Sequence, residues 1–129
     1  MVKMNNFDLC KGVCELSPAI LGAGIIENAS LVAVYARPES PVPNEEKFKR
    51  LFFQTEVIAG ITRTNADFFG QPRFFSIYFE NSDMYFFHLF KYPERRGVLA
   101  VMLSRDKYIH EELVTSITKY LDDILASPS

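Results

Sequence analysis

The sequence predicts one α+β domain in which helices cover both faces of a five-stranded antiparallel sheet. Segments with helical periodicity and segments rich in β-branched and aromatic residues follow each other in the order α-β-β-α-β-β-β-α. The links between successive strands are short, which favours antiparallel neighbours. The chain has 129 residues, of which 48% are hydrophobic, and this is enough for one core. We therefore expect a single domain over residues 1–129.

The first element is a helix expected over residues 6–17. Its apolar residues fall on one half of a helical wheel, and its polar residues fall on the other half. Asn5 or Asn6 can cap the start of this helix, and Pro18 marks its end.

Two antiparallel strands are expected next, over residues 20–27 and 31–35. The short polar link at residues 28–30 is typical of a hairpin. Gly22 and Gly24 stand inside the first strand, where glycine indicates a bulge or the close approach of another backbone.

The middle helix is expected over residues 45–64. A proline-rich loop at residues 38–43 precedes it, and Asn44 is a suitable N-cap. One apolar stripe of this helix is expected to pack on the sheet. Its members are Phe48, Leu51, Phe52, Thr55, Ile58, Ala59 and Thr62.

A second apolar stripe lies on another side of the same helix. Phe53, Val57 and Ile61 recur there at every fourth position. Gly60 stands beside them, although glycine costs roughly 1 kcal/mol in a helix interior, and it allows another backbone to come close. A monomer needs such a stripe only if one of its own loops covers it, which is the alternative interpretation. We predict instead a dimer interface formed by Phe53, Val57, Gly60 and Ile61.

Three strands and a helix complete the fold. After a connector at residues 65–71, the expected strands are residues 73–80, 84–90 and 98–104, linked as a meander. The nearly continuous apolar run of the first of these strands indicates that both faces of the sheet are covered. The aromatic second strand is expected in the sheet interior, because at an edge it would promote aggregation. The last helix is expected over residues 106–125, with one apolar face formed by Ile109, Leu113, Ile117, Leu121, Ile124 and Leu125.

This element order resembles that of the roadblock/LC7-like domain family, which is profilin-like and longin-related. The opening helix, around residues 9–16, runs straight into a first hairpin, residues 21–28 and 31–33, that is similar to the hairpin of that family. The resemblance covers nearly the whole chain, is carried by topology and a diffuse pattern, and suggests a divergent prokaryotic-type member. It implies a profilin-like sandwich and a homodimer in which the middle helix and the third strand meet their copies. It also implies a non-catalytic regulator or scaffold that acts alongside small GTPases or motor-type assemblies.

Composition and motifs predict no enzyme. The formal net charge of −2 and the pI of about 5.7 do not favour nucleic acid as a partner. No apolar run approaches the length of a membrane span. The Gly22-x-Gly24 pair lacks the third glycine and the following helix of a dinucleotide site. We therefore expect no catalytic residue, no metal and no cofactor.

The two cysteines and the polar-tipped aromatic residues are the alternative sites. Cys10 and Cys14 are four residues apart on the apolar side of a helix, where a disulfide is strained. We interpret them as small buried thiols in a reducing compartment, which predicts a cytoplasmic protein. The alternative function is a small-molecule sensing domain with a pocket between the sheet and the helices. Tyr78, Tyr85 and His88 are the candidate residues for such a ligand.

Overall fold

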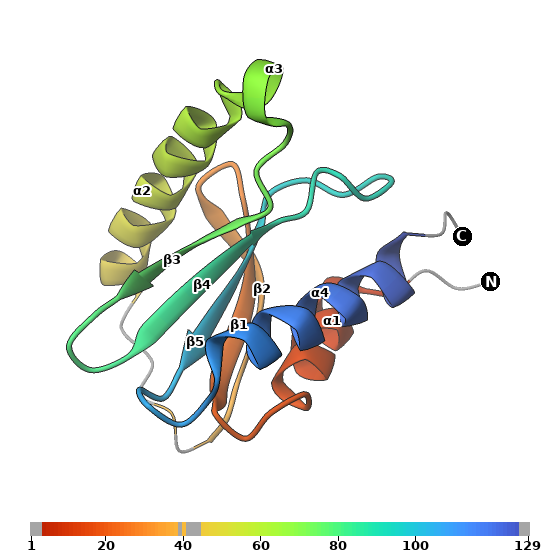
Figure 1. Cartoon of the computed structure of the whole chain (residues 1–129). Coiled ribbons are helices and arrows are strands. Elements are labelled where there is room, and N and C mark those ends of the chain that lie inside the picture. The colour runs from red at the N-terminus through yellow and green to blue at the C-terminus, as the bar shows by residue number, and fades with distance from the viewer. Residues whose placement is uncertain (1–3, 39, 41–44, 127–129) are drawn as a thin grey trace.

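The computed structural model describes residues 4–38, 40 and 45–126, apart from the side chains of Glu45 and Phe48. A five-stranded antiparallel sheet with strand order β2-β1-β5-β4-β3 forms its centre (Figure 1). In chain order the elements are α1 (Asn6–Cys14), β1 (Ile20–Glu27), β2 (Ser30–Ala36), α2 (Glu45–Arg63), α3 (Ala66–Phe69), β3 (Phe74–Tyr78), β4 (Asp83–His88), β5 (Val98–Leu103) and α4 (His110–Leu125). The predicted fold class is confirmed, including the meander of the last three strands and the interior position of β4.

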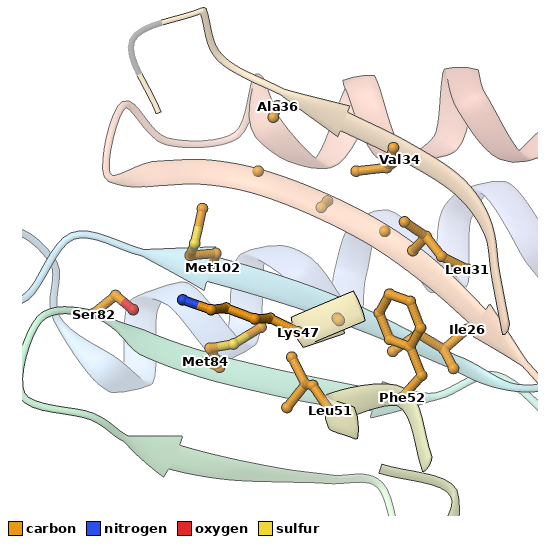
Figure 2. A pocket seen from close by; sticks show the side chains of 14 residues that line it. Ile26, Leu31, Val34, Ala36, Lys47, Leu51, Phe52, Ser82, Met84 and Met102 are labelled. Atoms are coloured by element: carbon orange, nitrogen blue, oxygen red, sulfur yellow. The ribbon is translucent and has the colours of Figure 1, made fainter. Parts of the chain in front are cut away.

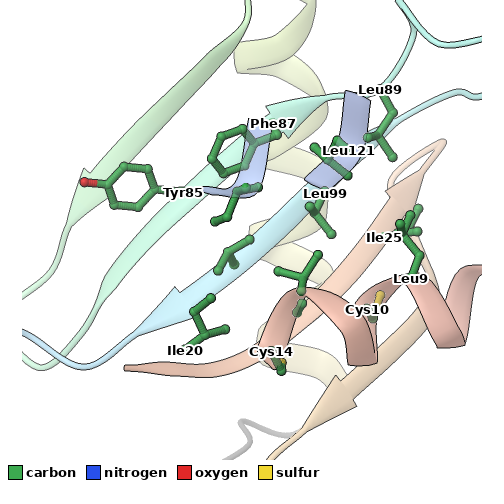
Figure 3. Close-up of a cluster of buried hydrophobic side chains, with 14 of the residues drawn as sticks. Leu9, Cys10, Cys14, Ile20, Ile25, Tyr85, Phe87, Leu89, Leu99 and Leu121 are labelled. Carbon is green, nitrogen blue, oxygen red and sulfur yellow. The ribbon is translucent and has the colours of Figure 1, made fainter. Parts of the chain in front are cut away.

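Two hydrophobic cores lie on opposite faces of the sheet. Helices α1 and α4 cover one face, and α2 covers the other (Figure 1). Figure 3 shows the larger core, in which Leu9 and Cys10 of α1 and Leu121 of α4 meet the sheet. The smaller core lies beneath α2 and consists of Ile26, Phe52, Ala59, Phe86, Val98 and Ala100.

Helix α1 begins where the sequence predicts but ends three residues earlier. The Asn5 side chain caps it and accepts a hydrogen bond of 2.8 Å from the Asp8 amide. After Cys14 the chain leaves the helix, and the Arg37 side chain binds the carbonyl oxygens of the link to β1. Its guanidinium group donates to Cys14 O, Ser17 O and Ile20 O. Arg37, the residue after β2, thus provides hydrogen-bond donors for carbonyl oxygens such as Cys14 O, which would bond within the helix if α1 were longer.

The two glycines of β1 meet the two predicted alternatives, a bulge at Gly22 and the close approach of another backbone at Gly24. The pairing of β1 shifts between Ile20 and Gly22 toward β5, and between Ile25 and Ile26 toward β2. A Cβ atom on Gly24 would lie 3.2 Å from the Ala33 carbonyl oxygen. Close packing of β2 against β1 therefore favours glycine here.

Two expectations about the second half of the chain are wrong in detail. The connector contains a short helix, α3. Helix α4 begins at His110 and not at residue 106, because a turn with Asp106 at φ 59° precedes it. Ile109 is therefore an exposed residue before the helix and not part of its apolar face. Strand β3 forms a sheet edge and is only partly buried. Its apolar run nevertheless meets covered faces on both sides, as predicted, because Phe74 packs against the core under α1 and α4, and Phe75 and Ile77 pack against the core beneath α2.

The other α4 residues confirm the predicted apolar face. Leu113, Ile117, Leu121 and Leu125 are buried, and Ile124 packs partly buried against the same core. Within the described part of the chain, no helix combines the length and the apolar character that a membrane span requires.

Candidate interaction surface

The inner face of α2 packs on the sheet as predicted. Phe52, Thr55 and Ala59 are buried. The Thr55 hydroxyl group donates to the Leu51 carbonyl oxygen at 2.8 Å, so this polar group is satisfied within the helix. Leu51, Ile58 and Thr62 are half-buried at the border of this face, and the side chain of Phe48 lies outside the described residues.

The outer face of α2 carries the second apolar stripe. The exposed fractions are 64% for Phe53, 45% for Val57 and 59% for Ile61. A Cβ atom placed on Gly60 would have no neighbour within 4 Å. The four residues predicted for a dimer interface therefore share one surface of the helix, and among the described segments no loop covers it.

Strand β3 extends this apolar surface. It pairs with β4 alone, so its other side has backbone groups that no described strand pairs. A groove of about 460 Å³ separates α2 from the end of β3, and its wall includes Phe53 and Val57 of α2 together with Ile77 and Phe79. We call Phe53, Val57, Gly60, Ile61, Ile77 and Phe79 the α2–β3 surface.

A separate apolar pocket lies between α2 and the other half of the sheet (Figure 2). Its volume is about 290 Å³. Gly22, Gly24 and Ala100 form part of its floor, where larger side chains would fill the space. Lys47 and Ser82 supply the polar side chains of its wall. The expectation of a pocket between the sheet and a helix is therefore met in this place.

The aromatic residues considered for a ligand do not form one site. Tyr85 lies in the core beneath α1 and α4, where its hydroxyl group bonds Nδ1 of His110 at 2.5 Å and the Tyr78 hydroxyl at 3.1 Å. His88 lines a pocket with residues of α2 instead. Side chains alternate between the two faces of a strand, so positions 85 and 88 cannot point the same way.

The cluster around Tyr85 contains residues that sequence reasoning missed. Tyr108 donates a hydrogen bond of 2.6 Å to the buried Asp83 carboxylate and lies 3.4 Å from the Tyr85 hydroxyl group. Burial raises the pKa of Tyr85 to about 12, so this phenol stays protonated at neutral pH. In the sequence, the only indication of this cluster was that Asp83 and Tyr85 are two residues apart and so lie on the same face of one strand. Tyr108 and His110 come from the loop before α4 and the start of that helix, and nothing in the local pattern joins them to β4.

The two cysteines are free and buried, as predicted. Burial raises the pKa of Cys10 to about 12 and that of Cys14 to about 11. Both groups are therefore thiols and not reactive thiolates at neutral pH. Cys14 Sγ lies 3.9 Å from the Tyr35 carbonyl oxygen, not beside a histidine base. Among the described residues, no three His, Cys, Asp or Glu side chains converge as metal ligands do.

Comparisons with solved structures show what fold this is. The chain superposes on a roadblock/LC7 domain from Streptomyces avermitilis with a TM-score of 0.66, at 11% identity over 95% of each chain. For the gliding protein MglB from Thermus thermophilus the TM-score is 0.67, at 11% identity over 97% of this chain and 94% of that one. Myxococcus xanthus MglB gives a TM-score of 0.64, at 12% identity over 92% of each chain. No protein-family model and no curated protein matches the sequence.

Proposed function

The chain has the roadblock/LC7 fold, and from this premise we propose that it works as a non-catalytic, dimeric interaction platform. The α2–β3 surface is the observation that carries the proposal. Single exposed apolar residues are ordinary, but a contiguous apolar patch marks an interaction site. Here the patch lies beside the edge of β3 that no described strand pairs, and such an edge itself favours pairing with another chain.

A second copy of the chain fits both features of this surface. Two copies related by a twofold axis would place α2 against α2 and the edge of β3 against its copy. The two five-stranded sheets would then be continuous, and the open backbone groups of β3 would be paired. One structure of the same fold, with a TM-score of 0.62 at 11% identity, is described as MglB with tetrameric arrangement. It supports the proposal to the extent that this fold occurs in an assembly.

The free energy gained by burying the second apolar stripe of α2 is too small to form a dimer alone, so the β3 edge must contribute as well. Phe53, Val57 and Ile61 are each about half exposed, and complete burial of such a side chain is worth about 1.5–3 kcal/mol. For two copies this yields roughly 5–10 kcal/mol, whereas association costs about 4–15 kcal/mol. Burial of the stripe alone therefore only about balances the cost of association. Burial of Phe79 and hydrogen bonds between the β3 edges would supply the remainder.

The experiment exchanges one valine on this surface for aspartate. Val57→Asp is expected to convert the dimer to a monomer, because a carboxylate would be buried beside its copy. The measurement is the solution mass by size-exclusion chromatography with light scattering, with circular dichroism to show that the variant is folded. Val32→Asp is a matched control, because Val32 is 47% exposed on β2, at the other edge of the sheet. A folded Val57→Asp variant that remains as dimeric as the control would contradict the proposed interface.

We further propose that the dimer regulates or scaffolds a small GTPase. This part of the proposal rests on the family resemblance of the sequence and on the fold. Purified candidate GTPases, loaded with GDP or with a GTP analogue, would be tested for binding to the dimer by interferometry. Saturable binding that depends on the nucleotide supports a regulatory role, and its absence with every GTPase of the source organism would contradict it.

The pocket of about 290 Å³ favours a second candidate function, the sensing of a small apolar molecule. Its lining is almost wholly apolar, with Lys47 at the wall, which suits a ligand with an acyl chain and an anionic end. A thermal-shift series with fatty acids of increasing chain length tests this function. The expected result is a rise in melting temperature that Ala36→Leu, which fills the pocket, abolishes. A series without any rise would remove this candidate.

A further inference from the structure

A second pocket lies at the opposite end of α2, between the last turns of that helix, the β1–β2 turn and the link from β4 to β5. Its volume is about 190 Å³, and four of its ten lining residues are charged. None of its residues belongs to the α2–β3 surface. Gly97 fixes one wall, because its φ of 82° and its contact with the Ile26 carbonyl group exclude a side chain.

His88 is the unusual residue of this pocket. It is only 3% exposed, and among the described residues neither of its ring nitrogens has a hydrogen-bond partner. The ring packs among aromatic rings, 5.2 Å from Phe90 and 6.0 Å from Phe75 between centroids. Burial of a polar group without a partner destabilises a fold, and phenylalanine would occupy this position without that penalty. Stability of the fold therefore does not explain the histidine.

The imidazole is neutral in this environment. Burial lowers the pKa of His88, and the positive charge of Arg63 lowers it further. A neutral imidazole offers one N–H donor and one acceptor nitrogen. Both nitrogens are closed off from solvent, so contact with a ligand requires movement of a wall side chain. Arg63 is exposed and lies with its guanidinium carbon 5.6 Å from the Phe90 ring centre, where its long stem allows such movement.

The charges around His88 are balanced in sign. Arg63 and Arg96 contribute two positive charges, and Glu27 and Glu56 contribute two negative charges. None of these four side chains takes part in an ion pair within the part of the chain that the structure describes. A purely anionic or cationic ligand would meet as many like charges as opposite ones. A ligand with both charges could pair with both sets.

We propose that this pocket binds a small zwitterion that carries one ammonium and one carboxylate group, of which free amino acids are the simplest class. Arg63 and Arg96 bind the carboxylate, and Glu27 and Glu56 bind the ammonium group. His88 supplies the missing hydrogen bond to the ligand once the wall side chain has moved. The inference goes beyond the proposed platform role and does not depend on dimerisation.

Histidine-selective isotope labelling offers a direct test, because the chain has two histidines. His110 lies on the other face of the sheet, bound to Tyr85, and serves as the internal reference. Each standard L-amino acid would be titrated while the ring signals are recorded by NMR. At least one is expected to shift the His88 signals saturably and leave those of His110 unchanged. For leucine, isoamylamine and 4-methylpentanoate are the matched analogues that lack one charge. Absence of any saturable His88 shift, or equal binding of a singly charged analogue, would overturn the proposal.

Variants then distinguish specific binding from a general effect, with affinity measured by calorimetry. Arg63→Gln is expected to weaken binding about tenfold through loss of a charged hydrogen bond. Arg50→Gln changes an exposed arginine of α2 that does not line the pocket, and it should bind like the unchanged chain. His88→Phe should lose binding while its melting temperature stays equal or rises. Unchanged affinity in both Arg63→Gln and His88→Phe would overturn the proposal.

Discussion

Two glycines illustrate how differently one residue type acts in this molecule. Gly97 has a φ of 82° and no room for a side chain, whereas Gly60 has an ordinary helical position and open space around it. The first is required by the monomer. The second costs the helix stability, which is understandable if the backbone of another copy approaches there.

Substitution of each glycine by alanine should therefore have opposite effects. Gly97→Ala is expected to destabilise the fold, because of backbone strain and overlap with the Ile26 carbonyl group. Gly60→Ala should raise the free energy of unfolding of the monomer by up to about 1 kcal/mol while it weakens the dimer. Urea denaturation at low protein concentration and light scattering at high concentration separate the two effects. A Gly60→Ala dimer as stable as the original would show that no backbone approaches this position.

His88 should make the stability of the chain depend on pH. Its pKa is lowered in the folded state, and on unfolding it regains its ordinary value of 6.5. Between these values the unfolded chain binds more protons, so the free energy of unfolding should fall as the pH drops below 6.5. Urea denaturation from about pH 8 to about pH 5 measures this dependence. The decrease should be smaller in His88→Phe, and an identical pH profile in both proteins would contradict a neutral buried His88.

At the level of elements, local patterns predict interiors of helices and strands better than their ends. The buried faces of α2 and α4 follow directly from helical periodicity. The end of α1 depends on Arg37, which lies on the far side of a hairpin, and the start of α4 depends on a turn at Asp106. Neither signal is local. The residue pattern alone did not reveal the edge position of β3, which only the family resemblance implied, because an apolar run looks the same whether a strand or a partner chain lies beside it.

The burial of α1 against the sheet predicts unreactive cysteines. Burial raises the pKa of Cys10 to about 12 and that of Cys14 to about 11, so few thiolates exist at about pH 8. A chromogenic disulfide reagent should react slowly with the native chain and rapidly in denaturant. Equal rates in both conditions would mean that α1 does not shield these thiols.

For the whole molecule, the element order was sufficient to predict the sheet and its two helical layers. The candidate site was predicted in part, because the two stripes of α2 are visible in the sequence. The proposed contact of β3 with its copy followed only from the family resemblance, and the charged pocket around His88 was not predictable, since its residues come from segments distant in the chain. Glu27 and Arg96 become neighbours only because β1 and β5 pair in the sheet.

The solution mass of the unchanged chain, measured by light scattering across a dilution series, tests the central claim most directly. The α2–β3 surface predicts a particle near twice the chain mass of 14.8 kDa, which dissociates only on strong dilution. A particle of 14.8 kDa at every concentration would show that two copies do not associate through this surface, and would contradict the platform proposed here.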